Sequence, residues 1–188
     1  MTSDKLVIGL AGMPGSGKSL VLNAASENGY AIIVMGDVIR EETQKRGLEP
    51  TPASIGQTML KLRQEEGKGV VAKRCIPKIE AANSQKIFVD GLRSLDEAEE
   101  FKKHFKNFTL VAIHSSPETR FKRLWKRRRS DDPPNWETFH ERDARELSVG
   151  LGNTIAMAEH VIINEDDIQI VKRRIKENLR KVETEWKE

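Results

Sequence analysis

The residues with the clearest chemical meaning form a glycine-rich segment that follows the apolar run Leu6-Val7-Ile8. The segment fits the pattern G-x-x-x-x-G-K-S and consists of Gly12, Met13, Pro14, Gly15, Ser16, Gly17, Lys18 and Ser19. Glycines at these positions let successive backbone N–H groups face one anion, and the next helix adds its positive end. Lys18 is expected to bind the β- and γ-phosphates of ATP, and Ser19 to bind Mg²⁺. The flanking strand and helix favour this phosphate-binding loop over a glycine-rich turn without a ligand.

Two later segments combine an aspartate with an arginine at the ends of predicted strands. Asp37 and Arg40 follow the second predicted strand, and Asp90 and Arg93 end the third. Ligands bind at the carboxyl ends of strands in open α/β sheets, so the first pair and Arg93 are expected to bind a phosphate acceptor. Asp90 is expected to hold Mg²⁺, directly or through water. A turn aspartate and a solvated arginine are an equally weighted alternative for either segment alone.

A strongly basic segment covers residues 120–129 and contains seven Lys or Arg side chains in ten positions. It is followed by a turn-rich break at 130–135 and a predicted helix at 136–147. Two helices joined by a short loop are typical of a lid, whose arginines neutralise a transferring phosphoryl group and exclude water. The expected lid arginines are Arg127, Arg129 and Arg142. A solvated face or a nucleic-acid patch is the alternative interpretation of the basic run.

Short apolar segments predict the strands that position these groups. They are residues 5–11, 30–35, 86–90, 108–114 and 160–163. Strands alternate with helical patterns, which indicates an α/β fold: a five-stranded parallel sheet with helices on both faces. The polar residues from Asn164 onward follow the last strand and could either flank an adenine or form an ordinary turn.

The stretch between the second and third predicted strands is mostly helical in pattern and too long for a simple crossover. We expect a single domain over 1–188, with a helical acceptor lobe at 37–85, a lid at 127–147 and a core of 1–36, 86–126 and 148–188. Within the lobe, Thr51 or Ser54 is expected to cap a helix, and Pro77 to kink or end one. From Glu165 onward, apolar residues at helical spacing predict an amphipathic helix on the sheet.

The composition indicates a globular domain without a membrane segment. Of the 188 residues, 32% are charged, and no apolar run approaches the roughly 20 residues that span a bilayer. The N-terminus does not read as a signal peptide, so we expect a cytoplasmic protein. A net charge of +3 disfavours a nucleic-acid partner. The only cysteine, Cys75, excludes an internal disulfide and a zinc site of paired cysteines, and is expected in the core.

These motifs resemble those of nucleoside monophosphate kinases, in particular adenylate kinases. Gly36-Asp37-Val38-Ile39-Arg40 is similar to their G-D-x-x-R, in which the arginine binds the acceptor phosphate. Residues 89–93 resemble their D-G-F-P-R without the proline, which brings Arg93 one residue closer to Asp90. Residues 123–127 resemble the R-x-x-x-R that precedes the lid.

The lid and the last strand extend the resemblance. Residues 129–132, together with the later Arg142, are similar to the R-x-D-D and the catalytic arginine of adenylate kinases. Residues 158–164 resemble the A-D-x-V-I-x-N of dephospho-coenzyme A kinases. Over nearly its whole length the chain resembles an uncharacterised archaeal family related to both. The resemblance implies a P-loop kinase fold with ATP and Mg²⁺ as cofactors.

We therefore expect a phosphotransferase that moves the γ-phosphoryl group of Mg²⁺·ATP to a nucleotide or nucleotide-like small molecule. The expected catalytic residues are Lys18, Asp37, Arg127, Arg129 and Arg142. If the acceptor group is a hydroxyl, Asp37 is the candidate general base; if it is a phosphate, no base is needed and the acceptor-side arginines matter more. The alternatives are an ATPase or nucleotide-dependent switch that acts with nucleic acid or a protein partner, and a nucleotide-binding regulator without catalysis.

Overall fold

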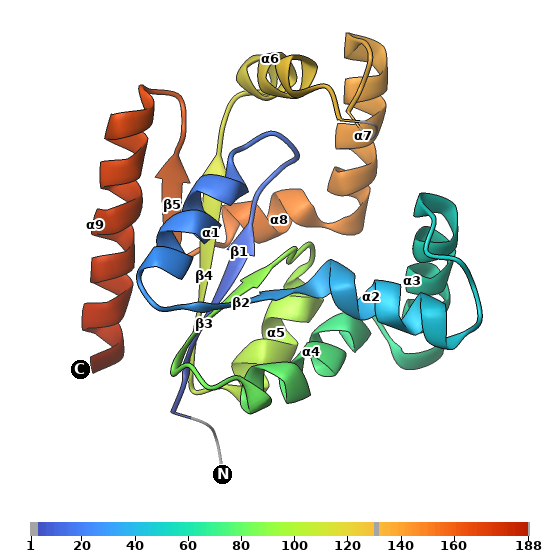
Figure 1. Ribbon diagram of the computed structural model, residues 1–188, viewed down its shortest axis with the longest axis horizontal. Helices are drawn as coiled ribbons and strands as arrows, with labels where there is room; N and C mark the ends of the chain where they lie inside the picture. Colours follow the sequence, from blue (N-terminus) through green and yellow to red (C-terminus); the bar gives the residue numbers. More distant parts are fainter. Residues whose placement is uncertain (1–3, 130–131, 188) are drawn as a thin grey trace.

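A five-stranded parallel sheet forms the centre of the protein in the computed structural model, which describes residues 4–129 and 132–187 (Figure 1). The strand order is β2-β3-β1-β4-β5. The strands are β1 (Leu6–Ala11), β2 (Ala31–Val34), β3 (Lys86–Asp90), β4 (Asn107–His114) and β5 (His160–Ile163). All neighbouring strands pair in parallel. The α/β fold predicted from the sequence is confirmed, and the strand bounds differ from the predicted ones by at most one residue at each end.

Helices cover both faces of this sheet. They are α1 (Lys18–Glu27), α2 (Met35–Lys45), α3 (Pro52–Glu66), α4 (Val70–Ala81), α5 (Leu95–His104), α6 (Pro117–Arg127), α7 (Trp136–Val149), α8 (Leu151–Ala156) and α9 (Ile168–Lys187). Alternate residues of β1 face opposite sides. Ile8 packs in the cluster that includes α1 and α9, and Val7 in the cluster that includes α2, α4, α5 and α8. Figure 1 shows α6 and α7 beyond the carboxyl ends of the strands.

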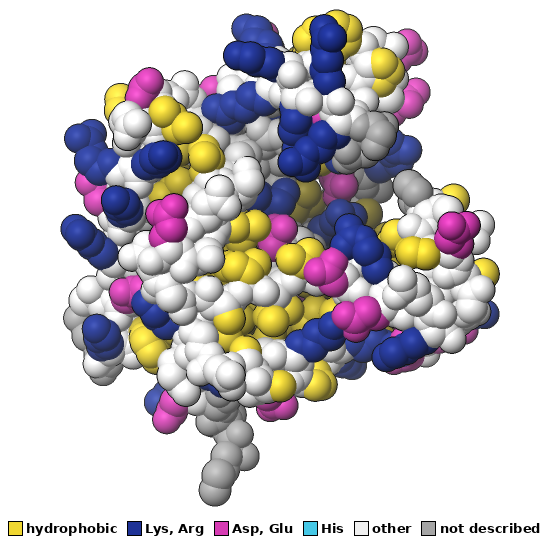
Figure 2. All heavy atoms as spheres, viewed as in Figure 1, with side chains coloured by type: hydrophobic (Ala, Val, Ile, Leu, Met, Phe, Trp, Pro, Cys, Tyr) yellow, Lys and Arg dark blue, Asp and Glu magenta, His cyan; other side chains and the backbone are white. Residues whose placement is uncertain are grey.

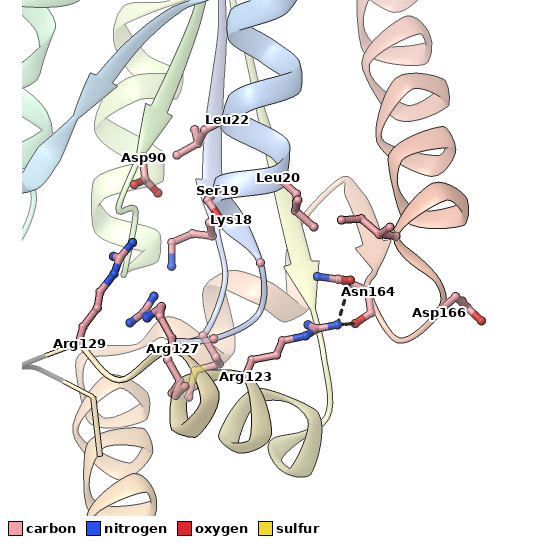
Figure 3. A pocket seen from close by; sticks show the side chains of 15 residues that line it. Lys18, Ser19, Leu20, Leu22, Asp90, Arg123, Arg127, Arg129, Asn164 and Asp166 are labelled. Carbon is pink, nitrogen blue, oxygen red and sulfur yellow. Dashed lines mark hydrogen bonds between the residues drawn. The ribbon is translucent and has the colours of Figure 1, made fainter. Parts of the chain in front are cut away.

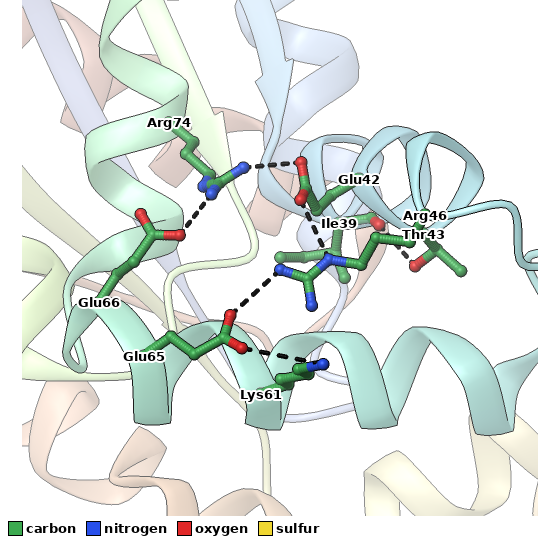
Figure 4. Close-up of polar contacts among 8 residues, drawn as sticks. All are labelled: Ile39, Glu42, Thr43, Arg46, Lys61, Glu65, Glu66 and Arg74. Carbon is green, nitrogen blue, oxygen red and sulfur yellow. Dashed lines mark hydrogen bonds and ion pairs between the residues drawn. The ribbon is translucent and has the colours of Figure 1, made fainter.

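The helices α2, α3 and α4 lie beside the sheet and are joined by a network of ion pairs (Figure 4). Arg74 contacts Glu42 and Glu66, at 2.7 and 2.5 Å, and Arg46 contacts Glu42 and Glu65, at 3.1 and 3.3 Å. Glu42 thereby links two arginines, and their charges lower the pKa of Glu42 despite its partial desolvation. These ion pairs connect α2, α3 and α4 to one another.

The local sequence signals predicted a cap at Thr51 or Ser54 and a kink or an end at Pro77, and the structure confirms the cap but not the end. Thr51 caps α3, and the Ser54 side chain closes the reciprocal hydrogen bond of a capping box. Pro77 lies inside α4, which continues to Ala81, so the helix does not end at the proline. Cys75 and Ile79 are buried one turn apart on the same face of α4. The free energy gained by burying these side chains exceeds the cost of the backbone hydrogen bond that Pro77 cannot donate. Cys75 is a core residue as predicted, and burial raises the pKa of its thiol to about 12.

The C-terminal helix begins at Ile168 rather than near Glu165, because the Asp167 side chain accepts a hydrogen bond from the Gln169 N–H at the start of α9. Of the five apolar residues predicted to pack on the sheet, Val171, Ile175, Leu179 and Val182 are buried. The fifth, Ile168, is exposed because it is the first residue of the helix. In the parts of the chain that the structure describes, no helix has the length and apolar character needed to cross a membrane.

Candidate functional site

The glycine-rich segment forms a loop between the end of β1 and the start of α1, as predicted (Figure 3). Gly15 and Gly17 have φ angles of +82° and +100°, which favour glycine. A Cβ atom on Gly12 would lie 2.9 Å from the Ile113 carbonyl oxygen. Gly17 occupies the N-cap of α1 and offers no side chain to the first-turn N–H groups. The Leu20 N–H donates to the Gly17 carbonyl oxygen at 2.9 Å, and the positive end of α1, which has no side-chain cap, suits an anion at the loop.

Lys18 and Asp90 lie at the centre of the site. The Lys18 ammonium donates to the Gly12 carbonyl oxygen at 2.9 Å. Burial lowers the pKa of Lys18, and the carboxylate of Asp90 acts in the opposite direction. Burial also raises the pKa of Asp90, although Lys18 and Arg93 oppose this change. The Oδ1 atom of Asp90 is buried and accepts no hydrogen bond from the described residues. This unpartnered oxygen is suited to a cation or a donor supplied by a ligand.

Two clefts adjoin this centre, and we name them the donor cleft and the acceptor cleft after the roles predicted from the sequence. The donor cleft has a volume of about 520 Å³ and includes Ser19, Arg123 and Asn164. The acceptor cleft has a volume of about 290 Å³ and is lined by basic side chains, among them Arg40, Arg93 and Arg142. Five residues line both clefts: Gly15, Lys18, Asp90, Arg127 and Arg129. The clefts therefore meet where the phosphate-binding loop faces the end of α6.

The predicted lid arginines lie at this junction. In Figure 3, Arg127 and Arg129 extend from the end of α6 toward Lys18. Arg127 makes two hydrogen bonds to the Asp132 carboxylate, at 3.0 and 2.5 Å, and the backbone N–H of Arg129 donates to the same group at 2.8 Å. The bonds from Arg127 are the main reason that the pKa of Asp132 is lowered. Two positions of the predicted lid loop, Ser130 and Asp131, lie outside the described residues.

On the acceptor side, the structure brings the arginines into the cleft but not the predicted general base. Arg40 forms an ion pair with Asp37, whose side chain is 55% exposed. Asp37 is absent from the described residues that line either cleft. The reason is that α2 begins at Met35, directly after β2, so that Asp37 lies in the first helical turn. Figure 2 shows Lys and Arg side chains around the hollow between the α6–α7 region and the α2–α3 region.

The acceptor cleft also contains a carboxylate that sequence reasoning missed. Glu146 of α7 lines this cleft, and one of its oxygens lies 3.6 Å from the Arg93 Nε atom. Arg142 lies one turn earlier on the same face of α7. The i, i+4 spacing of an arginine and a glutamate was the signal in the sequence, but it is common on solvated helices.

A buried polar network supports the phosphate-binding loop from behind. The Asn164 amide donates to the Ser16 carbonyl oxygen at 2.7 Å, and Arg123 donates to the Asn164 carbonyl and side-chain oxygens at 2.9 and 3.1 Å. Ser115 donates to the Asn164 carbonyl oxygen at 2.7 Å. Asn164 therefore holds the loop through its side-chain amide and also lines the donor cleft. Arg120 lies close by and is 3% exposed, so part of the basic run is internal rather than a solvated face.

Comparisons with known proteins agree with this architecture. Residues 11–140 match the family described as "AAA domain". The chain is similar to the UPF0200 proteins of Methanocaldococcus jannaschii, with 49% identity over 87% of this chain and 84% of the relative, and of Methanothermobacter thermautotrophicus, with 43% identity over 95% and 92%.

Solved structures with a similar fold include the protein TT1252 of Thermus thermophilus, with a TM-score of 0.66, 18% identity and coverage of 94% of this chain and 97% of the other. A second is the shikimate kinase of Bacteroides thetaiotaomicron, with a TM-score of 0.61, 15% identity and coverage of 95% and 98%. At this identity the likeness concerns the fold alone. The chain belongs to the UPF0200 family and carries an AAA domain with the α/β fold of P-loop kinases.

Proposed function

We propose that this protein is a phosphotransferase that moves the γ-phosphoryl group of ATP to a small molecule bound in the acceptor cleft. One observation carries the proposal: two separate clefts meet at Lys18, Asp90 and the arginines that end α6. A nucleotide-dependent switch or an ATPase needs only the donor cleft. A second, arginine-lined cleft that opens onto the same phosphate position supports transfer between two bound substrates.

The donor half would bind ATP through the loop N–H groups of residues 12–18 and through the Lys18 ammonium. The chain offers Ser19 and Asp90 to Mg²⁺: both line the donor cleft, and Asp90 keeps an unpartnered buried oxygen. The described residues hold no cluster of three or more His, Cys, Asp or Glu suited to a metal. Two oxygen ligands suit an ion that arrives with the nucleotide phosphates and keeps several waters. When bound, Mg²⁺ would neutralise charge on those phosphates.

In the transfer step, an oxygen of the acceptor forms a bond to the γ-phosphorus, the bond to the β–γ bridging oxygen breaks, and ADP leaves. Arg127 and Arg129 are placed to neutralise the charge on the transferring group, because they line both clefts. Arg142 enters from the acceptor side. We assign residues 127–147 to a lid that holds these arginines and excludes water.

We assign residues 37–85 to acceptor binding, on the evidence of a third cavity. It has a volume of about 230 Å³ and shares Gly36, Gly91 and Arg93 with the acceptor cleft. Its apolar lining comes from Met35, Ile39, Ile55, Met59 and Val71. Arginines in one compartment and apolar side chains in the next suit an acceptor with an anionic group and a flat apolar body, as a nucleoside monophosphate has. Because Arg40 and Arg93 line the acceptor cleft while Asp37 does not, a phosphate acceptor is favoured over a hydroxyl.

Transfer of radioactive label tests this function. The protein is incubated with Mg²⁺, γ-labelled ATP and a panel of nucleoside monophosphates, dephospho-coenzyme A and hydroxyl compounds such as shikimate. We expect label in one or more nucleoside monophosphates, and we expect Lys18→Met to abolish the transfer. Lys122→Met, which changes an exposed lysine outside the clefts, serves as the control. Label that reaches only inorganic phosphate would refute the proposal in favour of an ATPase.

A further inference from the structure

Arg120 joins three segments of the chain behind the phosphate-binding loop. Its guanidinium donates to the carbonyl oxygens of Ser115 and Pro14, both at 3.2 Å. It also makes two bonds to the Asp143 carboxylate, at 2.8 and 2.5 Å. Each of its three nitrogens therefore has an acceptor. Four of its five N–H donors are thereby used, and Arg120 lines neither cleft, so it is placed to hold other groups rather than to bind a substrate phosphate.

The same arginine holds the lid helix α7. Its guanidinium lies 4.9 Å from the centre of the Phe139 ring, and Asp143 follows Phe139 by one helical turn. Both residues are buried, so they form the stripe of α7 that is anchored to α6. Trp136 continues this stripe, with its ring 4.9 Å from that of Phe121 on α6.

The neighbouring stripe of α7 faces the acceptor cleft. Arg142 and Glu146 line that cleft, and Arg142 immediately precedes Asp143. Because consecutive residues of a helix point about 100° apart, the anchor at Asp143 determines the direction of Arg142. The other end of the anchor is the Pro14 carbonyl oxygen, which belongs to the phosphate-binding loop. The backbone of the loop and the direction of Arg142 are thus linked through one side chain.

We propose that Arg120 and Asp143 are positioning residues that couple the phosphate-binding loop to α7 and so place Arg142 in the acceptor cleft. The mechanical link stands on these contacts alone. Its effect on transfer rests on the phosphotransfer function proposed above. Among the described residues, Arg120 donates hydrogen bonds both to the Asp143 carboxylate and to the Pro14 carbonyl oxygen of the loop, so removal of that carboxylate charge should loosen both ends.

Hydrogen exchange without nucleotide tests the link itself. Asp143→Asn keeps the shape of the side chain but loses the charge that binds both guanidinium nitrogens. We expect exchange to become about threefold or more faster in both segments, residues 12–19 and 136–149. Glu183→Gln is the matched control: it breaks a part-buried pair with Lys86 at the amino end of β3, away from the loop, and both segments should keep their rates. Faster exchange confined to 136–149, or in neither segment, would overturn the proposal.

A second variant, Arg120→Lys, tests the same link if Asp143→Asn does not fold. Arg120→Lys keeps the charge, but a single ammonium cannot bridge Asp143 and the loop carbonyl as the guanidinium does. We expect the same paired increase in exchange, in a protein whose melting curve remains cooperative. Unchanged exchange in the loop of a folded Arg120→Lys protein would equally overturn the link.

Kinetics test the positioning role, with ATP and the acceptor that gains most label. We expect Asp143→Asn to lower kcat about tenfold and to change the KM for ATP less than about twofold. In an Arg142→Ala background, Asp143→Asn should cause no further loss, because Arg142 is the group it positions. Multiplicative losses would show a general structural role and overturn the positioning role. If the wild-type protein transfers label to no acceptor, the proposed function fails, while the exchange experiment still decides the link.

Discussion

Asp90 should destabilise the protein in the absence of nucleotide, and Asp90→Asn should therefore stabilise it. Burial raises the pKa of this carboxyl group, and the attraction of Lys18 and Arg93 does not offset the cost of burying its charge. Its Oδ1 atom also lacks a partner among the described residues. An unsatisfied buried acceptor costs about 1–3 kcal/mol, and asparagine removes the charge but keeps a polar atom there. We expect a gain of about 1 kcal/mol, or about 2–4 °C in Tm for a chain of this size.

The gain should depend on pH in a defined direction. A carboxyl group whose pKa is raised by folding costs stability above its folded pKa, where it is ionised in both states. Below the ordinary carboxyl pKa of about 3.9, it is protonated in both states and the cost disappears. The difference in Tm between Asp90→Asn and the wild type should therefore be largest near neutral pH and shrink as the pH falls through the folded pKa toward 4.

Thermal melts at pH 8 and pH 5 measure this difference, with Asp96→Asn as a control that neutralises an exposed carboxylate outside the clefts. Repeating the melts with ATP, with and without Mg²⁺, adds a functional readout. Wild-type protein should gain further stability from Mg²⁺ in the presence of ATP, and Asp90→Asn should lose that increment. A variant that is less stable than wild type at pH 8 without nucleotide would refute the reasoning, because attraction to Lys18 would then outweigh burial.

Three further outcomes follow from the site and the core. Gly17→Ala should cost more than 2 kcal/mol and abolish ATP binding, because its Cβ would collide with the Asn164 amide. Gly29 has a similar φ of +80° and no neighbour within 4 Å, so Gly29→Ala should cost only about 1 kcal/mol. Denaturant titration of both variants measures this difference in the free energy of unfolding. Cys75 should react with a thiol reagent at pH 8 only when the protein unfolds, since its pKa is about 12 and it is buried. Arg93→Ala should raise the KM for the acceptor about 10–100-fold, with a much smaller change in the KM for ATP.

The central strands β1 and β3 were predictable because they are largely buried and therefore appear as continuous apolar runs. The edge strand β5 was predicted from the same apolar pattern, although Val161 and Ile163 are exposed. The start of α2 was not predictable in the same way. Val34 precedes this helix and provides no side-chain cap, so the sequence carries no stop signal between β2 and α2. The helix consequently begins two residues before Asp37, and this carboxylate pairs with Arg40 instead of lining a cleft itself. The role of Asp37 as a general base stays a prediction.

The basic run illustrates a second limit of sequence reasoning. Seven cations in ten positions suggest a solvated face, yet Arg120, Arg123 and Arg127 follow one side of α6 at i, i+3 and i+7. Arg120 is buried behind the loop, Arg123 is hydrogen-bonded to Asn164, and Arg127 lies at the junction of the clefts. The spacing was visible in the sequence. Their partners were not, because Asp143 and Asn164 lie 23 and 41 positions away on other elements.

The two halves of the site differ in how their polar groups are satisfied, and this difference bears on how substrates bind. At the junction of the clefts, beside Ser19 of the donor cleft, Asp90 Oδ1 is buried with no hydrogen-bond partner in the described chain, so a cation that arrives with the nucleotide gains that contact directly. On the acceptor side, Arg40 is paired with Asp37, and Arg93 lies beside Glu146. An anionic acceptor must exchange these ion pairs rather than add to them, which reduces the net gain. Affinity for ATP should therefore exceed affinity for the acceptor.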